Sequence, residues 1–423
     1  MTSATSASSS IHSIALFRFV VRAVVAAVLV TGCATVPPPK PAPVVPPPAP
    51  PVVTPEAPGP RVTFTPAAWS DLPGWTIDRV DEAWPAFVVG CRALVADPKT
   101  SAVWRAPCAA AAVADVRDAA AARAFFDRHF SVWKVAFPDG RDTGIVTGYY
   151  EPLLAGSRTP SAQFRVPLFA APDDLLTVDL TALFPELKDK RVRGRVEGKS
   201  VVPYWPRADI EAGRAPLAGK ALAYVADPVD AFFLQIQGSG RVQLADGSVM
   251  RVGYADQNGH PYRSVARVLI ERGELTLERA SLQAIRAWGQ QHPDQLPALL
   301  DENPSYVFFR EVPPPAPGTL DASIDGPLGS LGVPLLRERT IAVDARAVPL
   351  GAPVFLATTR PLSTTPLQRL VLAQDTGGAI RGAVRADYFW GFGDAAGREA
   401  GRMRQDGQMW LLWPKDAGAP PAN

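Results

Sequence analysis

The chain has 423 residues, enough for about two to three domains, and 47% of them are apolar, which supplies a substantial core. Its 45 prolines exclude a purely helical protein, and its aromatic content excludes a wholly disordered one. The 43 basic and 41 acidic residues nearly cancel, so nothing in the charge indicates a nucleic-acid binder. Three cysteines and four scattered histidines show no CxxC or HxxxH spacing, and we expect neither a metal nor a cofactor.

Residues 1–32 have the features of a secretory signal peptide. Arg18 and Arg22 precede the apolar run 24–30, which is too short to span a membrane comfortably. The following Gly32-Cys33 resembles a bacterial lipobox, in which the cysteine becomes the lipidated N-terminus. Ala34 in place of Asp favours the outer membrane, so we expect an outer-membrane lipoprotein that faces the periplasm of a Gram-negative bacterium. The alternative is an ordinary cleaved signal with an incidental cysteine.

Residues 33–65 form the expected lipid anchor and linker. Thirteen prolines fall between Pro37 and Pro60, and proline lacks the donor that helix and sheet require. A semi-rigid polyproline spacer of this length could hold a domain up to ~70 Å from its anchor. A ligand for an SH3-type domain is the other interpretation of such a run.

Cys91 and Cys108 are the two cysteines that remain after the signal. In an oxidising periplasm they could form a disulfide that closes a loop of about 18 residues and contributes ~3 kcal/mol. Two independent buried thiols are the alternative.

The first half of the globular part predicts one helix followed by short strands. Apolar spacing predicts an amphipathic helix over 112–135, and the β-branched and aromatic run 144–150 predicts a strand. Asp246-Gly247 predicts a hairpin turn. Further apolar runs between turn residues predict strands at 221–225, 231–236 and 241–244.

The second half returns from helices to strands. We expect helices over 262–272 and 277–291, with a further helical turn at 296–300 before Asn303-Pro304. Short strands are expected at 340–343, 353–356, 369–373 and 409–413. The fold class is therefore mainly β with several helices.

Three aspartates stand out in the C-terminal third: Asp344, Asp375 and Asp387. Gly377-Gly378 beside Asp375 would let backbone amides approach closely, and a carboxylate held by amides would stay ionised. The aromatic setting of Asp387 could raise its pKa toward acid/base use. The alternative is that all three are turn residues or local caps.

Four sequence blocks stand out beside the three-aspartate C-terminal region: Thr147-Gly-Tyr-Tyr-Glu-Pro152, Leu234-Gln-Ile-Gln-Gly-Ser-Gly240, Gly253-Tyr-Ala-Asp-Gln-Asn-Gly-His-Pro-Tyr-Arg263 and Asn303-Pro-Ser-Tyr-Val-Phe-Phe309. Together they resemble the membrane-bound lytic murein transglycosylase A family. These blocks occur in family order across residues 147–413.

The resemblance implies a double-psi β-barrel built from 66–150 and 306–415, with a second β-rich domain inserted at 151–305 and a tail at 416–423. Glycan would lie in a groove between the two. The family cleaves the β-1,4 bond between N-acetylmuramic acid and N-acetylglucosamine without water and leaves a 1,6-anhydro end.

The resemblance also assigns the acids. Asp387 matches the family's catalytic aspartate, and Asp375 and Asp344 match its companion acidic positions. A nearby guanidinium would lower the pKa of Asp387, so we expect Arg385 to face away from it. One carboxyl suffices if the sugar's own C6 hydroxyl is the nucleophile, whereas a hydrolase normally needs two.

Other residues, most of them in these blocks, are candidate substrate contacts. Gln235 and Gln237 would point the same way on a strand, beside Gly238 and Ser239. The remaining candidates are Thr147, Gly148, Tyr149 and Tyr204, for all of which core or sheet roles are the alternative.

The predicted function is a lytic transglycosylase that acts on peptidoglycan glycan strands in cell-wall turnover and remodelling. A non-catalytic wall-binding lipoprotein and a conventional glycan hydrolase are the alternatives. We expect a monomer, held at the outer membrane by its lipid anchor, that could dock with cell-wall synthases.

Overall fold

The structure is a computed structural model that describes residues 61–187, 190, 192–277 and 280–422. The expected signal 1–32 and Cys33 lie outside the described residues. The chain divides into units 1–57 and 58–423, and the account below concerns the second. Within its described part, every helix is too short or too polar to cross a membrane.

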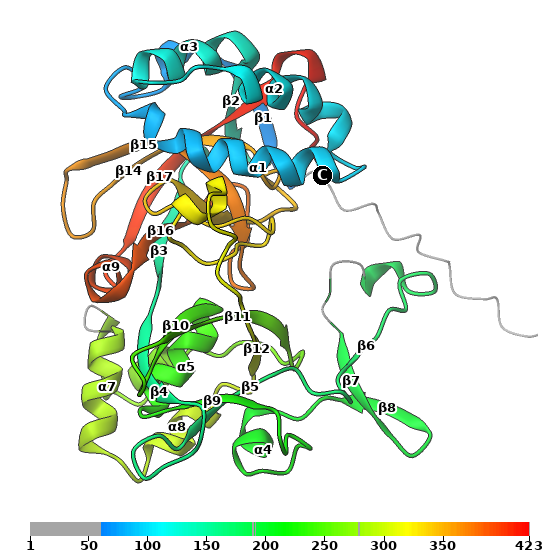
Figure 1. The fold of residues 1–423 in the computed structure, drawn as a ribbon, viewed down its shortest axis with the longest axis vertical. Helices are drawn as coiled ribbons and strands as arrows, with labels where there is room; N and C mark the ends of the chain where they lie inside the picture. Colours follow the sequence, from blue (N-terminus) through cyan, green and yellow to red (C-terminus); the bar gives the residue numbers. More distant parts are fainter. Residues whose placement is uncertain (1–60, 188–189, 191, 278–279, 423) are drawn as a thin grey trace, which may run out of the picture. The chain divides into compact units, whose positions relative to one another are not determined.

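Six strands close into a barrel (Figure 1). The order is β17-β14-β15-β13-β16-β3, and β3 pairs again with β17 to complete the ring. The β13–β15 and β16–β3 pairs are parallel, and the others are antiparallel. This confirms the predicted class of a mainly β protein with a barrel. The barrel strands are β3 (Gly144–Glu151), β13 (Thr340–Val343), β14 (Pro353–Thr359), β15 (Pro366–Thr376), β16 (Arg385–Phe392) and β17 (Arg404–Pro414).

Two more strands and three helices extend the barrel lobe. Strands β1 (Thr63–Ala67) and β2 (Phe130–Ala136) continue the sheet outward from β17. Helices α1 (Trp84–Ala96), α2 (Ser101–Val113) and α3 (Ala119–His129) lie together at the top of Figure 1, over the barrel. Their apolar faces join the barrel interior in one core that includes Phe87, Trp104 and Phe126.

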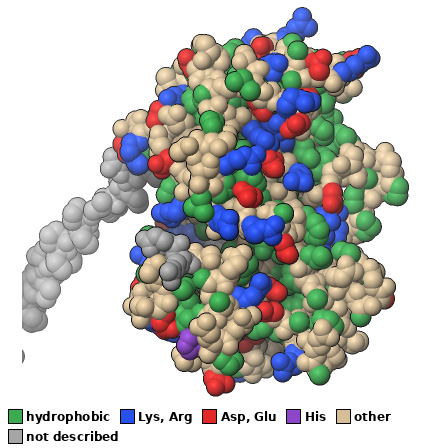
Figure 2. Space-filling view, turned by 90° about the vertical axis from the view of Figure 1, so that its left-hand side faces the viewer, with side chains coloured by type: hydrophobic (Ala, Val, Ile, Leu, Met, Phe, Trp, Pro, Cys, Tyr) green, Lys and Arg blue, Asp and Glu red, His purple; other side chains and the backbone are tan. Residues whose placement is uncertain are grey.

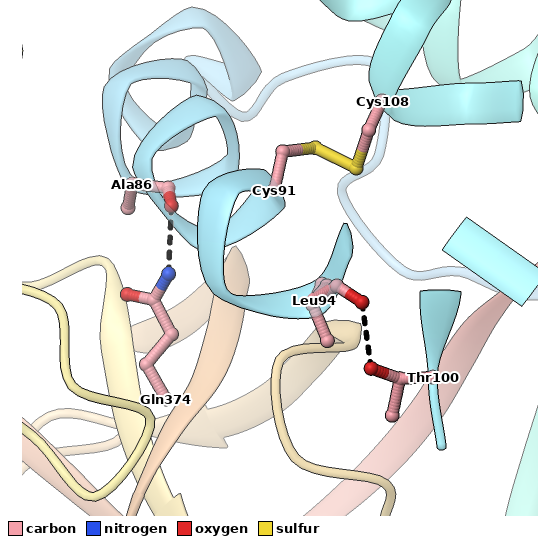
Figure 3. The surroundings of a disulfide bond; sticks show 6 residues. All are labelled: Ala86, Cys91, Leu94, Thr100, Cys108 and Gln374. Carbon is pink, nitrogen blue, oxygen red and sulfur yellow. Dashed lines mark hydrogen bonds between the residues drawn. A yellow bond between two sulfur atoms is a disulfide. The ribbon is translucent and has the colours of Figure 1, made fainter. Parts of the chain in front are cut away.

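A disulfide joins α1 to α2 (Figure 3). Cys91 and Cys108 lie with their Cα atoms 5.4 Å apart, 17 positions apart in the sequence. The Thr100 hydroxyl donates to the Leu94 carbonyl oxygen at 2.7 Å and stabilises the turn between the two helices. The disulfide thus links two consecutive helices, which together span Trp84–Val113.

The inserted lobe is built on a second six-stranded sheet, in the order β12-β11-β10-β4-β9-β5. A parallel bridge between Ala170 and Phe309 joins its two edges. Helix α4 (Arg207–Glu211), the small sheet of β6 (Leu176–Thr177), β7 (Arg193–Glu197) and β8 (Ser200–Pro203), and helices α5 to α8 complete the lobe. The sheet strands are β4 (Leu153–Ser157), β5 (Val166–Phe169), β9 (Ala221–Val225), β10 (Ser239–Leu244), β11 (Val249–Gln257) and β12 (Val307–Glu311). The helices are α5 (Pro228–Gln237), α6 (Val265–Glu271), α7 (Leu282–Gln291) and α8 (Leu296–Asp301).

Several predicted elements are present. The strand at 144–150 is β3, the Asp246-Gly247 turn links β10 to β11 with Gly247 at a φ of 86°, and the two predicted long helices are α6 and α7. Both helices begin later than predicted, because Ser264 and Ser281 cap them by accepting from backbone N–H groups three residues on.

The predicted helix over 112–135 was wrong at both ends. Asp118 caps α3 by accepting from the Ala121 N–H at 2.8 Å, so the helix begins only at Ala119. From Phe130 on, an aromatic and β-branched run forms β2, which pairs with β1 and β17. Residues 112 and 113 belong instead to α2, which the sequence analysis missed together with α1.

The predicted strand at 231–236 was also wrong, because this segment is helix α5. Asp227 accepts from the Val229 N–H at 2.7 Å, Pro228 occupies the first turn, and Gly238 ends the helix at a φ of 79°. Cap, proline and terminal glycine together outweigh the strand preference of the Phe-Phe-Leu run. Gln235 and Gln237 therefore do not share one face of a strand.

Candidate active site

Strand alternation directs Asp387 out of the barrel. Its neighbours Ala386 and Tyr388 belong to the barrel core, so the side chain between them faces the other way. On the neighbouring parallel strand β3, Thr147 pairs with Asp387. Tyr149 lies two residues further along β3, on the same outward face.

Strand β13 brings the second aspartate to this face. Ala342 pairs with Asp387 on one side and with Asp375 on the other. The two aspartates are thus two strand spacings apart, about 9.6 Å between Cα atoms. Ala342 lies between them and is buried against Tyr149 and Phe389. We call the surface formed by Thr147, Tyr149, Asp375 and Asp387 the acid face.

A β-bulge in β15 sets the direction of Asp375. Ile341 pairs with Ala373 but Ala342 pairs with Asp375, which leaves Gln374 as the extra residue. The Gln374 amide is directed to helix α1, where it donates to the Ala86 carbonyl oxygen at 2.6 Å (Figure 3). One inserted residue therefore returns the next side chain to the acid face.

Asp387 is partly buried and has one engaged oxygen. Its Oδ1 accepts from the Thr147 hydroxyl at 2.6 Å, whereas Oδ2 accepts no hydrogen bond from any side chain or amide that the structure describes. Burial raises the pKa of Asp387, the Thr147 hydrogen bond and the Arg385 charge oppose that rise, and the charge of Asp375 adds to it. The raised pKa agrees with the acid role expected from the sequence, and its largest cause is burial.

Arg385 does not face away from the site, so that expectation was wrong. Arg385 and Asp387 are two residues apart on one strand and therefore share its outward face. The guanidinium donates to the Thr147 Oγ1 at 2.9 Å, and the Thr147 hydroxyl donates to Asp387. The charge is held one hydroxyl away from the carboxyl, and its lowering effect on the Asp387 pKa is smaller than the rise from burial.

Asp375 has donors on both oxygens. Its Oδ1 accepts from the Ser330 amide and hydroxyl, each at 2.9 Å, and its Oδ2 accepts from the Tyr149 hydroxyl at 3.0 Å. Burial raises its pKa, and these donors oppose that rise. The amide that holds this carboxyl comes from Ser330 and not from the expected Gly377-Gly378. Ser330 was missed in the sequence because Gly329-Ser330 indicates only a loop, 45 residues from its partner.

Asp344 lies apart from these two carboxyls. One residue beyond β13, it forms a two-point ion pair with Arg346 at 2.8 and 2.7 Å and accepts from the Gly382 N–H at 3.0 Å. Burial raises its pKa, but Arg346 and the backbone donors outweigh burial and lower it overall. This arrangement fits the local-cap interpretation that the sequence left open.

Three of the expected substrate contacts lie within the inserted lobe. Tyr204 is buried, and its hydroxyl donates to Asp174 at 2.9 Å. Gln235 is buried and accepts from the Arg207 guanidinium at 2.6 Å. The Gln237 Oε1 accepts from the Tyr150 N–H at 3.1 Å, where the chain passes between the two lobes. Each of these side-chain atoms already has a protein partner.

The small residues of the expected contact set have backbone roles. A Cβ on Gly148 would come within 2.6 Å of the Trp390 Nε1, so this glycine permits close packing on the side of β3 opposite Thr147 and Tyr149. Gly238 ends α5, and Ser239 begins β10, partly exposed. Of the expected contacts, the acid face brings together Thr147 and Tyr149.

Across the described ranges, no group of three or more His, Cys, Asp or Glu side chains could hold a metal ion. The acid face offers two carboxyls, two hydroxyl groups and a guanidinium held behind one of them. This set can donate a proton from a desolvated carboxyl and stabilise charge beside it.

Comparisons with known proteins match both halves of this architecture. The family model of the MltA-specific insert domain matches residues 145–310, and that of the 3D domain matches residues 339–413. Membrane-bound lytic murein transglycosylase A of Escherichia coli K12 is 32% identical over 302 residues, which cover 67% of this chain and 70% of that protein.

Solved structures agree. MltA of Neisseria gonorrhoeae is 38% identical with a TM-score of 0.73, covering 87% of this chain and 96% of its own. E. coli MltA with bound chitohexaose is 26% identical with a TM-score of 0.59, covering 86% and 93%. By its sequence matches and its fold, the chain belongs to the membrane-bound lytic murein transglycosylase A family.

Proposed function

We propose that this protein is a peptidoglycan lytic transglycosylase with Asp387 as its single acid/base. It cleaves the β-1,4 bond between N-acetylmuramic acid and N-acetylglucosamine and leaves a 1,6-anhydro end, in the turnover and remodelling of the cell wall. The observation that carries this proposal is the state of Asp387. It is a carboxyl of raised pKa on the acid face, with an oxygen that no described protein group occupies.

The reaction begins with Asp387 protonated. Its proton passes to the glycosidic oxygen as that bond breaks and the sugar develops oxocarbenium character. The resulting carboxylate takes the proton of the C6 hydroxyl, whose oxygen bonds to C1 of the same sugar. One carboxyl thus serves twice, and the internal nucleophile replaces water at high effective concentration.

The surroundings of Asp375 support this reading over hydrolysis. A hydrolase needs a second carboxylate that is free to attack or to activate water. Both Asp375 oxygens already accept from Ser330 and Tyr149. Asp375 instead positions Tyr149 and adds negative charge near the developing cation, and it raises the Asp387 pKa. Asp344, paired with Arg346, has a supporting role at the end of β13.

The acid face would bind the glycan strand of peptidoglycan. E. coli MltA is known with bound chitohexaose, a β-1,4-linked amino-sugar oligomer, and its fold covers 86% of this chain. Thr147 and Tyr149, which flank the two acids, are the substrate contacts that we retain, together with the partly exposed Ser239.

The membrane attachment is a further part of this proposal. Cys33 would carry the lipid, and the proline-rich linker would hold the catalytic unit away from the outer membrane on its periplasmic side. Replacing Cys33 by Ala should move the protein from the membrane fraction to the soluble periplasmic fraction. A Cys33→Ala variant that stays in the membrane fraction would contradict the lipid anchor.

The direct test is mass spectrometry of fragments released from purified sacculi by the detergent-solubilised protein. Three forms are compared: the native chain, Asp387→Asn, and Asp115→Asn as a control at an exposed site between α2 and α3. We expect anhydro ends from the native chain and the control, and none from Asp387→Asn.

The other outcomes assign the alternatives. Free reducing ends would indicate a conventional hydrolase, with Asp375 as the first candidate for its second carboxylate. Binding to sacculi without release by any form would indicate a non-catalytic scaffold. Anhydro ends from Asp387→Asn would show that another residue is the acid.

A further inference from the structure

A pocket of about 370 Å³ lies on the side of β3 opposite the acid face. Thr147 and Tyr149 face the acids, whereas Tyr150, the next residue, lines this pocket. Its walls come from both lobes: the end of β3, helices α5 and α7, and helix α9 (Gly393–Ala400), which follows β16 directly. We call it the α7–α9 pocket. It is separate from the site at Asp387.

Charged side chains of both signs gather on this side of the molecule. Figure 2 faces the side on which Figure 1 draws α7 and α9, and it shows basic and acidic side chains next to one another around a hollow at mid-height. Those that line the pocket are Asp230, Arg286, Asp394 and Arg398.

Two of these charged side chains, Arg286 and Asp230, form an ion pair within the protein. Arg286 forms ion pairs with Asp230 and, at 3.7 Å, with Asp227. Its Nε atom is nevertheless fully covered and makes no hydrogen bond. Burial raises the pKa of Asp230, which the Arg286 charge opposes. The Arg286–Asp230 ion pair is therefore a part of the pocket lining whose charges are already neutralised by each other.

The other two charges are open. Asp394 and Arg398 are exposed, four residues apart on α9, and neither forms an ion pair or hydrogen bond with any residue in the described part of the chain. At 1.5 Å rise per residue their Cα atoms are about 6 Å apart along the helix. The Tyr150 hydroxyl and the Gln283 amide, which also line the pocket, likewise lack partners in the described part of the chain.

The rest of the lining is apolar. Phe233, Leu153 and Leu282 are among the lining residues, and Tyr150 lies so close to α9 that a Cβ on Gly397 would come within 2.9 Å of its ring. A wall glycan presents hydroxyl and acetamido groups, its only charge is the lactyl carboxylate of N-acetylmuramic acid where no peptide is attached, and it bears no ammonium. A site with a cation and an anion that have no partner among the described residues, and with apolar lining, instead matches a segment that bears a carboxylate, an ammonium and a short aliphatic chain.

We infer that the α7–α9 pocket binds a zwitterionic segment of the peptide attached to the wall glycan, with the peptide carboxylate on Arg398 and its ammonium on Asp394. A volume of about 370 Å³ suits about one or two amino-acid residues. The inference rests on the proposed function only for the source of the ligand, which is peptidoglycan. It gives the enzyme a contact with peptide-bearing wall material remote from the bond that is cleaved.

Calorimetry on the full chain tests this inference. The probes are the tripeptide L-Ala-γ-D-Glu-meso-diaminopimelate, the same tripeptide with its amines acetylated and its carboxyls amidated, and chitohexaose. The test variant is Asp394→Asn with Arg398→Gln. Its matched control is Glu271→Gln with Arg267→Gln, an exposed i,i+4 pair on α6 that lines neither site. Thermal melting establishes that both variants are folded.

We expect the native chain and the control to bind the charged tripeptide, the test variant to bind it at least tenfold more weakly, and the blocked tripeptide to bind to none. The KM for peptide-bearing fragments, relative to the KM for peptide-free glycan, should rise in the test variant. No binding by the native chain, equal binding by the test variant, or displacement of the tripeptide by chitohexaose would overturn the inference. Activity that survives in Asp387→Asn would overturn the proposed acid while leaving this result intact.

Discussion

The acid face of the barrel and the core of the inserted lobe both enclose polar side chains, but they leave them in different states. In the inserted lobe, Arg207 donates to the carbonyl oxygens of Asn303 and Ser305 and to Gln235. Asn258 donates to two carbonyl oxygens and accepts from the Tyr306 N–H. On the acid face, Asp387 keeps an oxygen without a described partner.

This difference distinguishes polar side chains that only stabilise the fold from a carboxyl that can take part in a reaction. Gln235 and Tyr204 looked like substrate contacts in the sequence, yet their hydrogen-bonding groups are engaged inside the lobe. A buried polar group that is fully paired stabilises one conformation. A partly buried carboxyl with an open oxygen is costly to keep ionised, and that cost provides the raised pKa of an acid. The predictions below test this division.

The largest effect is expected for Asp387→Asn. Loss of the general acid should lower kcat/KM on sacculi by about a hundred- to ten-thousandfold. The folded-state pKa of Asp387 is raised, so this carboxyl contributes stability at low pH that is lost as pH rises. Asn has no such loss, and the melting temperature of the variant at pH 7 should equal or exceed that of the native chain. A large fall in melting temperature would mean that Asp387 is structural.

Arg207→Met should have the opposite profile. It removes the donor to Gln235 and to two buried carbonyl oxygens, and should lower the free energy of unfolding by about 3 kcal/mol. Denaturant unfolding measures this change. Arg214→Met in the same lobe, whose partner Asp209 is at the surface, should cost less than about 1 kcal/mol. Equal costs for the two would contradict the structural role assigned to Arg207.

Asp375→Asn should lower kcat/KM by about tenfold, because the two donors of Ser330 and the Tyr149 hydroxyl lose a charged acceptor. The charge of Asp375 also raises the pKa of Asp387. Its removal should move the alkaline limb of the pH–rate profile to lower pH, since the enzyme needs Asp387 protonated. An alkaline limb that stays in place would mean that the two carboxyls do not interact.

Arg385→Gln should have the smallest effect, and one of opposite sign. The guanidinium lowers the Asp387 pKa, so its removal should shift the alkaline limb of kcat/KM to higher pH. Arg402→Gln, at an exposed arginine just after α9, serves as the control for net charge and should leave the limb in place. A shift to lower pH would show that Arg385 does not act on Asp387 by its charge.

Local signals in the sequence were sufficient where they were strong and agreed with each other. The β-branched run at 144–150 forms a strand, Asp246-Gly247 forms a hairpin turn, and the resemblance of residues 147–413 identified the family and the barrel. Where local signals for helix and strand competed, the N-cap residue determined where a helix formed or began. Asp227-Pro228 made a helix from an apolar segment predicted to be a strand, and Asp118 delayed the start of α3.

By itself, the sequence determined the family, the β-rich class and the candidate acids, because motifs, periodicity and turn residues are local properties of the chain. Only the tertiary structure decided how those acids differ. The bulge at Gln374 and the register through Ala342 brought Asp375 and Asp387 to one face, while Arg346 paired with Asp344. Thr147 then donates to one oxygen of Asp387, 240 residues away, and leaves the other without a described partner. Ser330 donates to Asp375, 45 residues away. Such contacts join distant parts of the chain, and no local pattern encodes them.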